Sequence, residues 1–184
     1  MTRDQLLDLL RSADLALLLP EVAALQKVPQ SPEYHAEGNA FVHTLLSLES
    51  LPKDTTERLV WAVALHDIGK ADTTRWLDEQ WRAPGHDRCS AEMVPKVLER
   101  FDRYDLIQDV VWLVRHHHFA GNWQPKSTHV LTPRQRRFCE HPLFDLLVDL
   151  CRADAAGSRG KSTKLELLER VLGARNTIQR RPLK

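Results

Sequence analysis

Residues 59–70 read LVWAVALHDIGK, and this stretch decides the fold. Residues 59–65 are all apolar, so a helix here is apolar on every side and belongs in the interior of the protein. His66 and Asp67 follow directly. Burying an unpartnered polar group costs roughly 2–7 kcal/mol, and burying an unpaired charge costs more. The sequence therefore predicts a compensating partner at the end of this helix, and a metal ion is the natural candidate.

The length and composition indicate one soluble domain. The chain has 184 residues, so we expect a single domain over residues 1–184. Lys plus Arg number 26 and Asp plus Glu 25, so the net charge does not indicate a nucleic-acid or membrane partner, and RNA binding would need a local patch. No signal-peptide core or membrane-spanning run is present, and the three cysteines have no CxxC spacing. We expect a cytoplasmic protein with reduced thiols and no membrane partner.

The hydrophobic spacing predicts an all-α fold. Asp54 or Thr55 is the expected cap of the central helix, and Pro95 is expected to mark a break or a first helical turn. Residues 71–85 are expected to form a loop, with a small hairpin around Trp76 and Trp81 as an open alternative. Residues 4–18 are expected to form two short helices or one helix with a break near Ser12. The other expected helices cover about residues 21–27, 35–50, 55–68, 87–101, 105–118, 132–140, 142–155 and 163–172, the last followed by a basic tail.

Helical spacing turns Asp154 toward the interior. Leu143, Leu147 and Leu150 precede it at spacings of four, three and four residues, which places all four side chains on one helical face. Asp154 therefore continues an apolar stripe. A buried aspartate that pairs with an arginine or caps a neighbouring helix fits the same pattern, so the stripe alone does not decide between a structural residue and a ligand.

The same argument separates three consecutive histidines. The residues four, seven and eleven positions before His117 are apolar, so His117 points inward. His118 continues a neighbouring stripe, and His116 falls on a more polar side of the helix. A run of histidines can also be a polar helix end. The spacing favours His117 as the ligand and leaves His118 open.

Three more histidines lie in segments that could reach the same point. His43 is in a helix with small neighbours, His86 precedes a helix, and His35 is near a helix start. Each alone fits a hydrogen-bonded core residue or a capping residue. Taken with His66, Asp67, His117 and Asp154, however, they supply imidazole and carboxylate ligands from separate segments. That ligand set suits Mn, Fe, Co, Ni or Zn better than a pure Mg site.

The pattern H43…H66-D67…D154 resembles the HD superfamily of metal-dependent phosphohydrolases, of which HDIGK is a recognisable form. The likeness covers about residues 19–160, the expected core of the domain, and is greatest to the HD domains of bacterial CCA-adding tRNA nucleotidyltransferases. It extends to the HD modules of RNA-repair polynucleotide kinases. The segments that carry it are LPEVAALQKVPQSPEYHAEGNAFVHTLLSLE, ALHDIGKADTT, GHDRCSAEMV, LVRHHH and RADAAGS.

This resemblance implies a helical HD-type domain with a metal site at the centre of the helix bundle. It implies one or two divalent ions, Mn, Ni, Co, Fe or Mg, with Asp67 able to bridge two of them about 3.5–4 Å apart. Lys70 would act with Asp67 in catalysis and bind phosphate, with a solvated surface lysine as the open alternative. The implied ligands are His43, His66, Asp67 and Asp154 for the first metal and Asp67, His86 and His117 for the second; Arg88, Arg115 and Lys126 are further candidate phosphate contacts.

Three departures from related patterns narrow the function. Residues 1–18 are too few for a nucleotidyltransferase head, so we expect no nucleotide addition. FAGNWQP lacks the GYP signature of cyclic-di-GMP phosphodiesterases. GSRGKST is not a phosphate-binding loop, because the first required glycine falls at Ala155 and a helix, not a strand, precedes it.

The resemblance implies hydrolysis of a phosphomonoester or phosphodiester. The expected substrate is an RNA end or nucleotide with a 2′,3′-cyclic, 2′- or 3′-phosphate, and the expected partner is an RNA-repair or tRNA-processing protein. The alternatives are a nucleotidase on free mononucleotides and a non-catalytic nucleic-acid-binding module. A further alternative is a di-iron oxygenase with the same metal ligands. The native metal, the exact substrate and the oligomeric state stay open.

Overall fold

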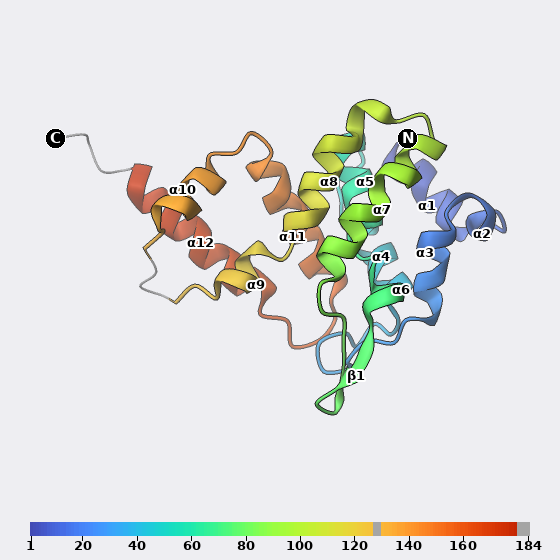
Figure 1. Ribbon diagram of the computed structural model, residues 1–184, viewed down its shortest axis with the longest axis horizontal. Coiled ribbons are helices and arrows are strands. Elements are labelled where there is room, and N and C mark those ends of the chain that lie inside the picture. Colours follow the sequence, from blue (N-terminus) through green and yellow to red (C-terminus); the bar gives the residue numbers. More distant parts are fainter. Residues whose placement is uncertain (127–129, 180–184) are drawn as a thin grey trace.

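The computed structural model describes residues 1–126 and 130–179, and its regular secondary structure there is helical apart from one hairpin (Figure 1). The predicted all-α class is confirmed. Two short strands form one antiparallel hairpin. The elements are α1 Arg3–Arg11, α2 Leu15–Leu18, α3 Pro20–Ala24, η1 Leu25–Lys27, α4 Ala40–Glu49, α5 Glu57–Leu65, α6 Lys70–Thr73, β1 Arg75–Leu77, β2 Gln80–Arg82, α7 His86–Arg100, η2 Tyr104–Leu106, α8 Ile107–His116, α9 Phe119–Trp123, α10 Pro133–Cys139, α11 Phe144–Gly157 and α12 Lys164–Gln179.

Helix α5 is the centre of the molecule. All residues from 59 to 70 are buried, as the sequence predicts. Helices α1, α4, α8 and α11 pack around α5. Thr56, and not Asp54 or Thr55, caps the helix, because its side chain accepts a hydrogen bond from the backbone N–H of Leu59. The packed helices bring their ends together at the end of α5.

Several helix boundaries differ from the prediction. Helix α4 begins at Ala40 and not near residue 35, because Gly38 has a positive φ of 116° and Asn39 caps the helix. Helix α7 runs unbroken through Pro95. Its buried apolar face against α8 offsets the roughly 3 kcal/mol that an interior proline costs.

Helix boundaries in the second half of the chain also differ from the prediction. The predicted helix over residues 105–118 is divided into η2 and α8, and its last two residues form a turn before α9. Helix α9 then covers Phe119–Trp123, which lies outside the predicted helices. Helix α11 begins at Phe144, later than predicted, and α12 continues to Gln179 through the segment expected to be a tail. No helix in the described part of the chain is both long and apolar enough to cross a membrane.

The hairpin left open by the sequence is present. Its strands β1 and β2 place Trp76 opposite Trp81. The hairpin projects from the helical body, between α6 and α7 in the chain (Figure 1). Buried apolar residues from Leu6 to Val171 form one core cluster. That core holds in place the helix ends that carry the candidate site.

Candidate metal centre

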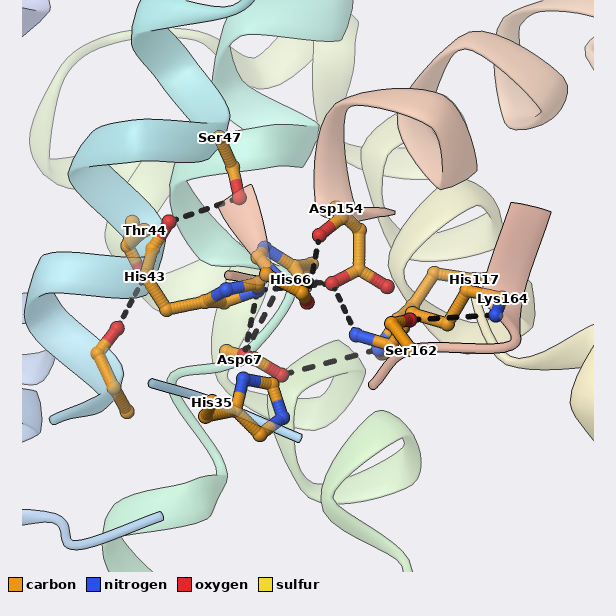
Figure 2. Close-up of polar contacts among 12 residues, drawn as sticks. His35, His43, Thr44, Ser47, His66, Asp67, His117, Asp154, Ser162 and Lys164 are labelled. Atoms are coloured by element: carbon orange, nitrogen blue, oxygen red, sulfur yellow. Dashed lines mark hydrogen bonds and ion pairs between the residues drawn. The ribbon is translucent and has the colours of Figure 1, made fainter. Parts of the chain in front are cut away.

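His66 and Asp67 lie where α5 ends and the chain turns toward α6. The Nδ1 atom of His66 donates a hydrogen bond to the carbonyl oxygen of Val63 at 2.7 Å. Because a carbonyl only accepts, this bond places a proton on Nδ1 and leaves Nε2 available toward the centre. Both side chains are buried. Figure 2 shows them in the middle of a cluster of imidazoles and carboxylates.

His86 and His117 repeat this arrangement on two other helices. His86 is the first residue of α7, and His117 is the C-cap of α8. Their Nδ1 atoms donate to the carbonyl oxygens of Ala83 at 2.7 Å and Val114 at 2.6 Å. A hydrogen bond from the second ring nitrogen is what orients metal-binding histidines. Three imidazoles are therefore held with Nε2 toward one region.

Asp67 faces a different pair of imidazoles with each carboxylate oxygen. Its Oδ2 lies 3.2 Å from His66 Nε2 and 3.8 Å from His43 Nε2. Its Oδ1 lies 3.2 Å from His86 Nε2 and 3.9 Å from His117 Nε2. One carboxylate thus joins two groups of possible ligands. We call His43, His66 and Asp154 with Oδ2 the carboxylate side, and His86, His117 and His118 with Oδ1 the imidazole side.

Asp154 completes the carboxylate side from α11. It is 3% exposed, and its Oδ1 lies 2.9 Å from His43 Nε2 and 3.6 Å from His66 Nε2. The three leucines that precede it on the same helical face are buried, so the predicted inward stripe is confirmed. Residues from α4, α5 and α11 therefore meet at one place, as Figure 2 shows.

Two glycines let the helices approach closely enough for this. A Cβ on Gly69 would lie 2.5 Å from the backbone nitrogen of Ser90 and 2.7 Å from the carbonyl oxygen of His86. A Cβ on Gly157 would lie 2.8 Å from the carbonyl oxygen of His43. Such distances are shorter than real Cβ contacts. Gly69 is therefore required for the packing of the imidazole side, and Gly157 for that of the carboxylate side.

The donors fit a bound cation. Among the described residues, Asp67 Oδ1, Asp67 Oδ2 and His66 Nε2 are buried without a hydrogen-bond partner, although Lys70 Nζ forms an ion pair with Oδ2 at 2.7 Å. Buried polar atoms are rarely left without a hydrogen-bond partner. The Nε2 atoms of His86 and His117 lie 3.3 Å apart while both Nδ1 atoms donate elsewhere. In the neutral rings two lone pairs face each other, which a shared cation would relieve.

Electrostatics differ between the two sides. Burial opposes a charge on His66, but Asp67 and Asp154 outweigh it and raise the pKa of His66 to about 9. Burial also opposes the charges of the two carboxylates. Nearby cations outweigh it and hold the pKa of each well below its usual range, chiefly His66 for Asp67 and Lys164 for Asp154. The carboxylate side is therefore a strongly charged cluster.

On the imidazole side, burial instead disfavours the charged forms of His117 and His118. Burial, followed by the charge of His118, lowers the pKa of His117 well below its usual value. Burial and the charge of His86 lower the pKa of His118 to about 3. A ring nitrogen of His118 lies within 4.8 Å of ligand atoms of His86 and His117. The structure therefore brings both His117, which the spacing favoured, and His118, which it left open, to the site. His116 turns away and packs against Trp112.

Two lysines neutralise the carboxylates. Lys70 is 8% exposed and also donates to Gln30 Oε1 at 2.8 Å, so it is a buried residue and not a solvated one. Lys164 Nζ lies 2.6 Å from Asp154 Oδ1. Sequence reasoning missed Lys164, which begins α12 after a turn and belongs to no apolar stripe. Its only signal was its position behind the basic, glycine-containing segment 157–163.

Glu37 is a second residue that sequence reasoning missed. Its side chain is fully buried, and Oε1 accepts from His43 Nδ1 at 3.1 Å and from His35 Nδ1 at 2.7 Å. Its Oε2 accepts from the backbone N–H of Arg159 at 2.8 Å. Glu37 therefore orients His43 as backbone carbonyls orient the other imidazoles. The position of His35 near the site was the available signal.

A pocket of about 440 Å³ opens beside the centre. Lys70 and Lys164 line it. Arg88, Arg115 and Lys126 are not among its lining residues, and Arg88 and Lys126 are exposed to solvent. Of the predicted phosphate contacts, Lys70 alone therefore lies at this pocket. The lining residues nearest the centre are Lys70, His86, His118 and Lys164, with His35 on the α4 side.

Histidines and aspartates gathered at the ends of central helices are typical of helical metal-binding domains. The family model described as HD domain matches residues 34–156. The chain belongs to the HD domain family, which confirms the resemblance read from the sequence. HD domains bind divalent metal, and the clustered ligands fit that property.

Curated relatives place the chain within that family. It is 34% identical over 166 residues to the Multifunctional CCA protein of Halorhodospira halophila, covering 87% of this chain and 40% of that protein. A Multifunctional CCA protein of Neisseria meningitidis is 36% identical, covering 78% of this chain and 35% of the relative. One from Pseudomonas fluorescens is 32% identical, covering 82% and 37%. The chain thus spans little more than a third of these relatives.

Proposed function

We propose that the chain is a metal-dependent phosphohydrolase that acts on nucleotide or RNA-end phosphates, such as 2′,3′-cyclic, 2′- or 3′-phosphates. The observation that carries the proposal is the placement of Asp67, whose two oxygens face two separate imidazole pairs. Such a carboxylate can serve two cations at once. In a phosphohydrolase, two divalent cations provide Lewis acidity at phosphate oxygens and lower the pKa of a water molecule.

We propose the following roles for the side chains. His43, His66, Asp67 and Asp154 would hold one cation, and Asp67, His86 and His117 the other. Lys70 and Lys164 border the pocket next to these ligands and add positive charge where a phosphate group would enter. An ammonium group paired with a ligand carboxylate is free to bind phosphate oxygens once a cation neutralises that carboxylate. Both lysines would therefore bind substrate.

The substrate class rests on the pocket and on the relatives. A volume of about 440 Å³ is in the range of small-ligand pockets and suits one nucleotide. The relatives are named Multifunctional CCA proteins, which favours RNA or nucleotide phosphates over other esters. We further propose an RNA-repair or tRNA-processing setting and a cytoplasmic location.

A first assay tests the reaction class. Purified protein with Mn, Ni, Co or Mg is incubated with bis-p-nitrophenyl phosphate and with p-nitrophenyl phosphate. We expect p-nitrophenol release that depends on metal, and the ratio of the two rates measures diester against monoester preference. Protein that is shown to hold metal but turns over neither ester would contradict hydrolysis and favour a non-catalytic nucleic-acid-binding module.

A second assay tests the substrate and the site together. A panel of 2′,3′-cyclic, 2′- and 3′-nucleotides and of phosphate-ended RNA is compared for the wild type, Asp67→Ala and the exposed control Asp72→Ala. We expect activity in the wild type and the control and none in Asp67→Ala. Equal rates on free mononucleotides and RNA ends would favour a nucleotidase. Activity that survives in Asp67→Ala would show that the centre is elsewhere.

A further inference from the structure

The β1–β2 hairpin exposes two tryptophans that the core does not use. Trp76 and Trp81 are opposite each other in the ladder, with ring centroids 5.1 Å apart at an interplanar angle of 69°. They are 58% and 38% exposed, and neither belongs to the core cluster of the described residues. An edge-to-face pair supports the hairpin and still leaves indole surface open to a ligand. This surface is suited to stacking a planar group.

Two arginines face each other on the other side of the same hairpin. Arg75 pairs with Arg82 across the strands, and both are exposed. Like charges directly opposite each other destabilise a sheet. Within the described part of the chain, Arg82 has a long contact with Asp78 at 3.7 Å, and Arg75 donates to the carbonyl of Thr74 at 3.4 Å. An anionic ligand on this face would offset the repulsion.

The hairpin is joined to the proposed metal centre at both ends. Helix α6, which begins with Lys70, leads into β1, and β2 is followed by His86 at the start of α7. The same pocket is lined by Lys70, His86 and Lys164 and also by Trp81 and Arg82 of the hairpin. A ligand whose phosphate lies at the centre would therefore extend toward the hairpin.

We propose that this hairpin is a binding subsite for single-stranded RNA, in which Trp81 and Trp76 stack an unpaired base and Arg75 and Arg82 bind backbone phosphates. The inference rests on the proposed function, since it places the nucleotides that precede the terminal phosphate. Aromatic rings stack any base that is not paired, and base pairs in a duplex are closed to them. Charge complementarity with the arginines favours a polyanion over an apolar protein partner.

Binding of a fluorescein-labelled single-stranded RNA of 12 nucleotides, measured by anisotropy with the full chain, tests the subsite directly. Loss of one stacking ring in Trp81→Ala is expected to weaken binding by roughly 5- to 150-fold. Trp81→Phe keeps a ring and should restore much of the affinity. Replacing both arginines by serine should reduce the salt slope by about 1.4, which corresponds to two phosphate contacts.

Tyr104→Ala is the matched control, because Tyr104 is 64% exposed and lies beyond the far end of α7 from the hairpin. We expect unchanged RNA affinity and unchanged thermal melting in this control, and thermal melting should show every hairpin variant to be folded at the assay temperature. Equal affinity of wild type and Trp81→Ala would overturn the proposal. So would equal competition by duplex RNA, or self-association of the chain that disappears in Trp76→Ala.

The outcome is separable from that of the proposed function. Hydrolysis of bis-p-nitrophenyl phosphate by the wild type and Asp67→Ala tests the proposed function, whereas RNA binding by the hairpin variants tests the subsite. A wild type that hydrolyses no ester but binds RNA through Trp81 would retain the subsite and reject the phosphohydrolase. Hydrolysis by a chain whose hairpin variants all bind RNA normally would do the reverse.

Discussion

The carboxylate side and the imidazole side share Asp67 but differ in charge. The carboxylate side adds the second carboxylate of Asp154 and a histidine whose pKa is raised to about 9. The imidazole side adds His117 and His118, whose charged forms burial disfavours, with the pKa of His118 lowered to about 3. Two carboxylates attract a divalent cation more strongly than one. The comparison teaches that the two sides offer a cation unequal charge, and we expect the carboxylate side to bind a metal first.

Asp67→Ala should have the largest effect, because Asp67 is the residue that both sides share. We expect the variant to lose both metals, as measured by mass spectrometry of the purified protein, and all hydrolysis. In EDTA-treated protein the variant also leaves Lys70 buried without its carboxylate, and breaking a buried pair costs about 3–5 kcal/mol of unfolding free energy. Asp72→Ala controls for charge. One full equivalent of retained metal in Asp67→Ala would remove its bridging role.

Separate variants of the two sides should lose different metals. Asp154→Asn removes the second carboxylate, and we expect the affinity of the first metal to fall by more than about 100-fold, beyond what an orienting residue contributes. His117→Ala should reduce the stoichiometry from two to one and leave the first affinity within about tenfold. Isothermal titration with Mn²⁺ measures both. Identical losses in the two variants would mean that one cation spans both sides.

Gly69 and Gly157 allow the two sides to be compared through their packing, because each glycine lies at a close helix contact on one side. In Gly69→Ala the added Cβ meets backbone atoms of α7, and in Gly157→Ala it meets the carbonyl oxygen of His43. Overpacking of this kind costs roughly 1–3 kcal/mol of unfolding free energy. We expect Gly69→Ala to weaken the second metal alone and Gly157→Ala the first. Urea unfolding and metal titration measure the two effects.

Gly121→Ala is the control for these glycines, since a Cβ there has no neighbour within 4 Å. It lies in α9, so alanine should be neutral or slightly stabilising. A loss of stability in Gly121→Ala equal to that in Gly69→Ala would show that close packing is not the cause. Loss of the same metal in Gly69→Ala and Gly157→Ala would contradict the separation of the two sides.

The sequence predicted which residues of a helix face the interior, because helical spacing determines this. Asp154 and His117 end apolar stripes, and both are buried at the centre because a helix repeats its faces regularly. The all-α class and the central burial of residues 59–70 followed from the same regularity. Whether the named residues bind metal stays a prediction that the variants above test.

Other parts of the site could not be predicted because they depend on turns and on the approach of distant helices. Glu37 lies in the irregular segment before α4, and Lys164 reaches Asp154 from the start of α12. No periodic pattern extends across a turn. The long-range contacts between α4 and α11, and thus the role of Gly157, depend on tertiary packing that spacing along one helix does not show.

Glu37→Gln should have the smallest of these effects and should be confined to the carboxylate side. The variant keeps the shape of the side chain but removes the charge that accepts from His43 Nδ1, and orienting partners of this kind contribute about 10- to 100-fold to metal affinity. On the imidazole side, backbone carbonyls hold the same ring nitrogen of His86 and of His117, so these two rings do not depend on a side-chain carboxylate for their orientation. We therefore expect the first metal to bind more weakly and the second to be unchanged, measured by titration with Mn²⁺.

Glu33→Gln is the matched control, since Glu33 is exposed and lies in the same irregular segment before α4. It should leave both affinities at their wild-type values. Glu37→Asp restores the charge on a shorter side chain and should recover part of the lost affinity. If Glu37→Gln weakened both metals equally, its effect would come from a general loosening of the segment before α4, and the orientation of His43 would have to come from elsewhere.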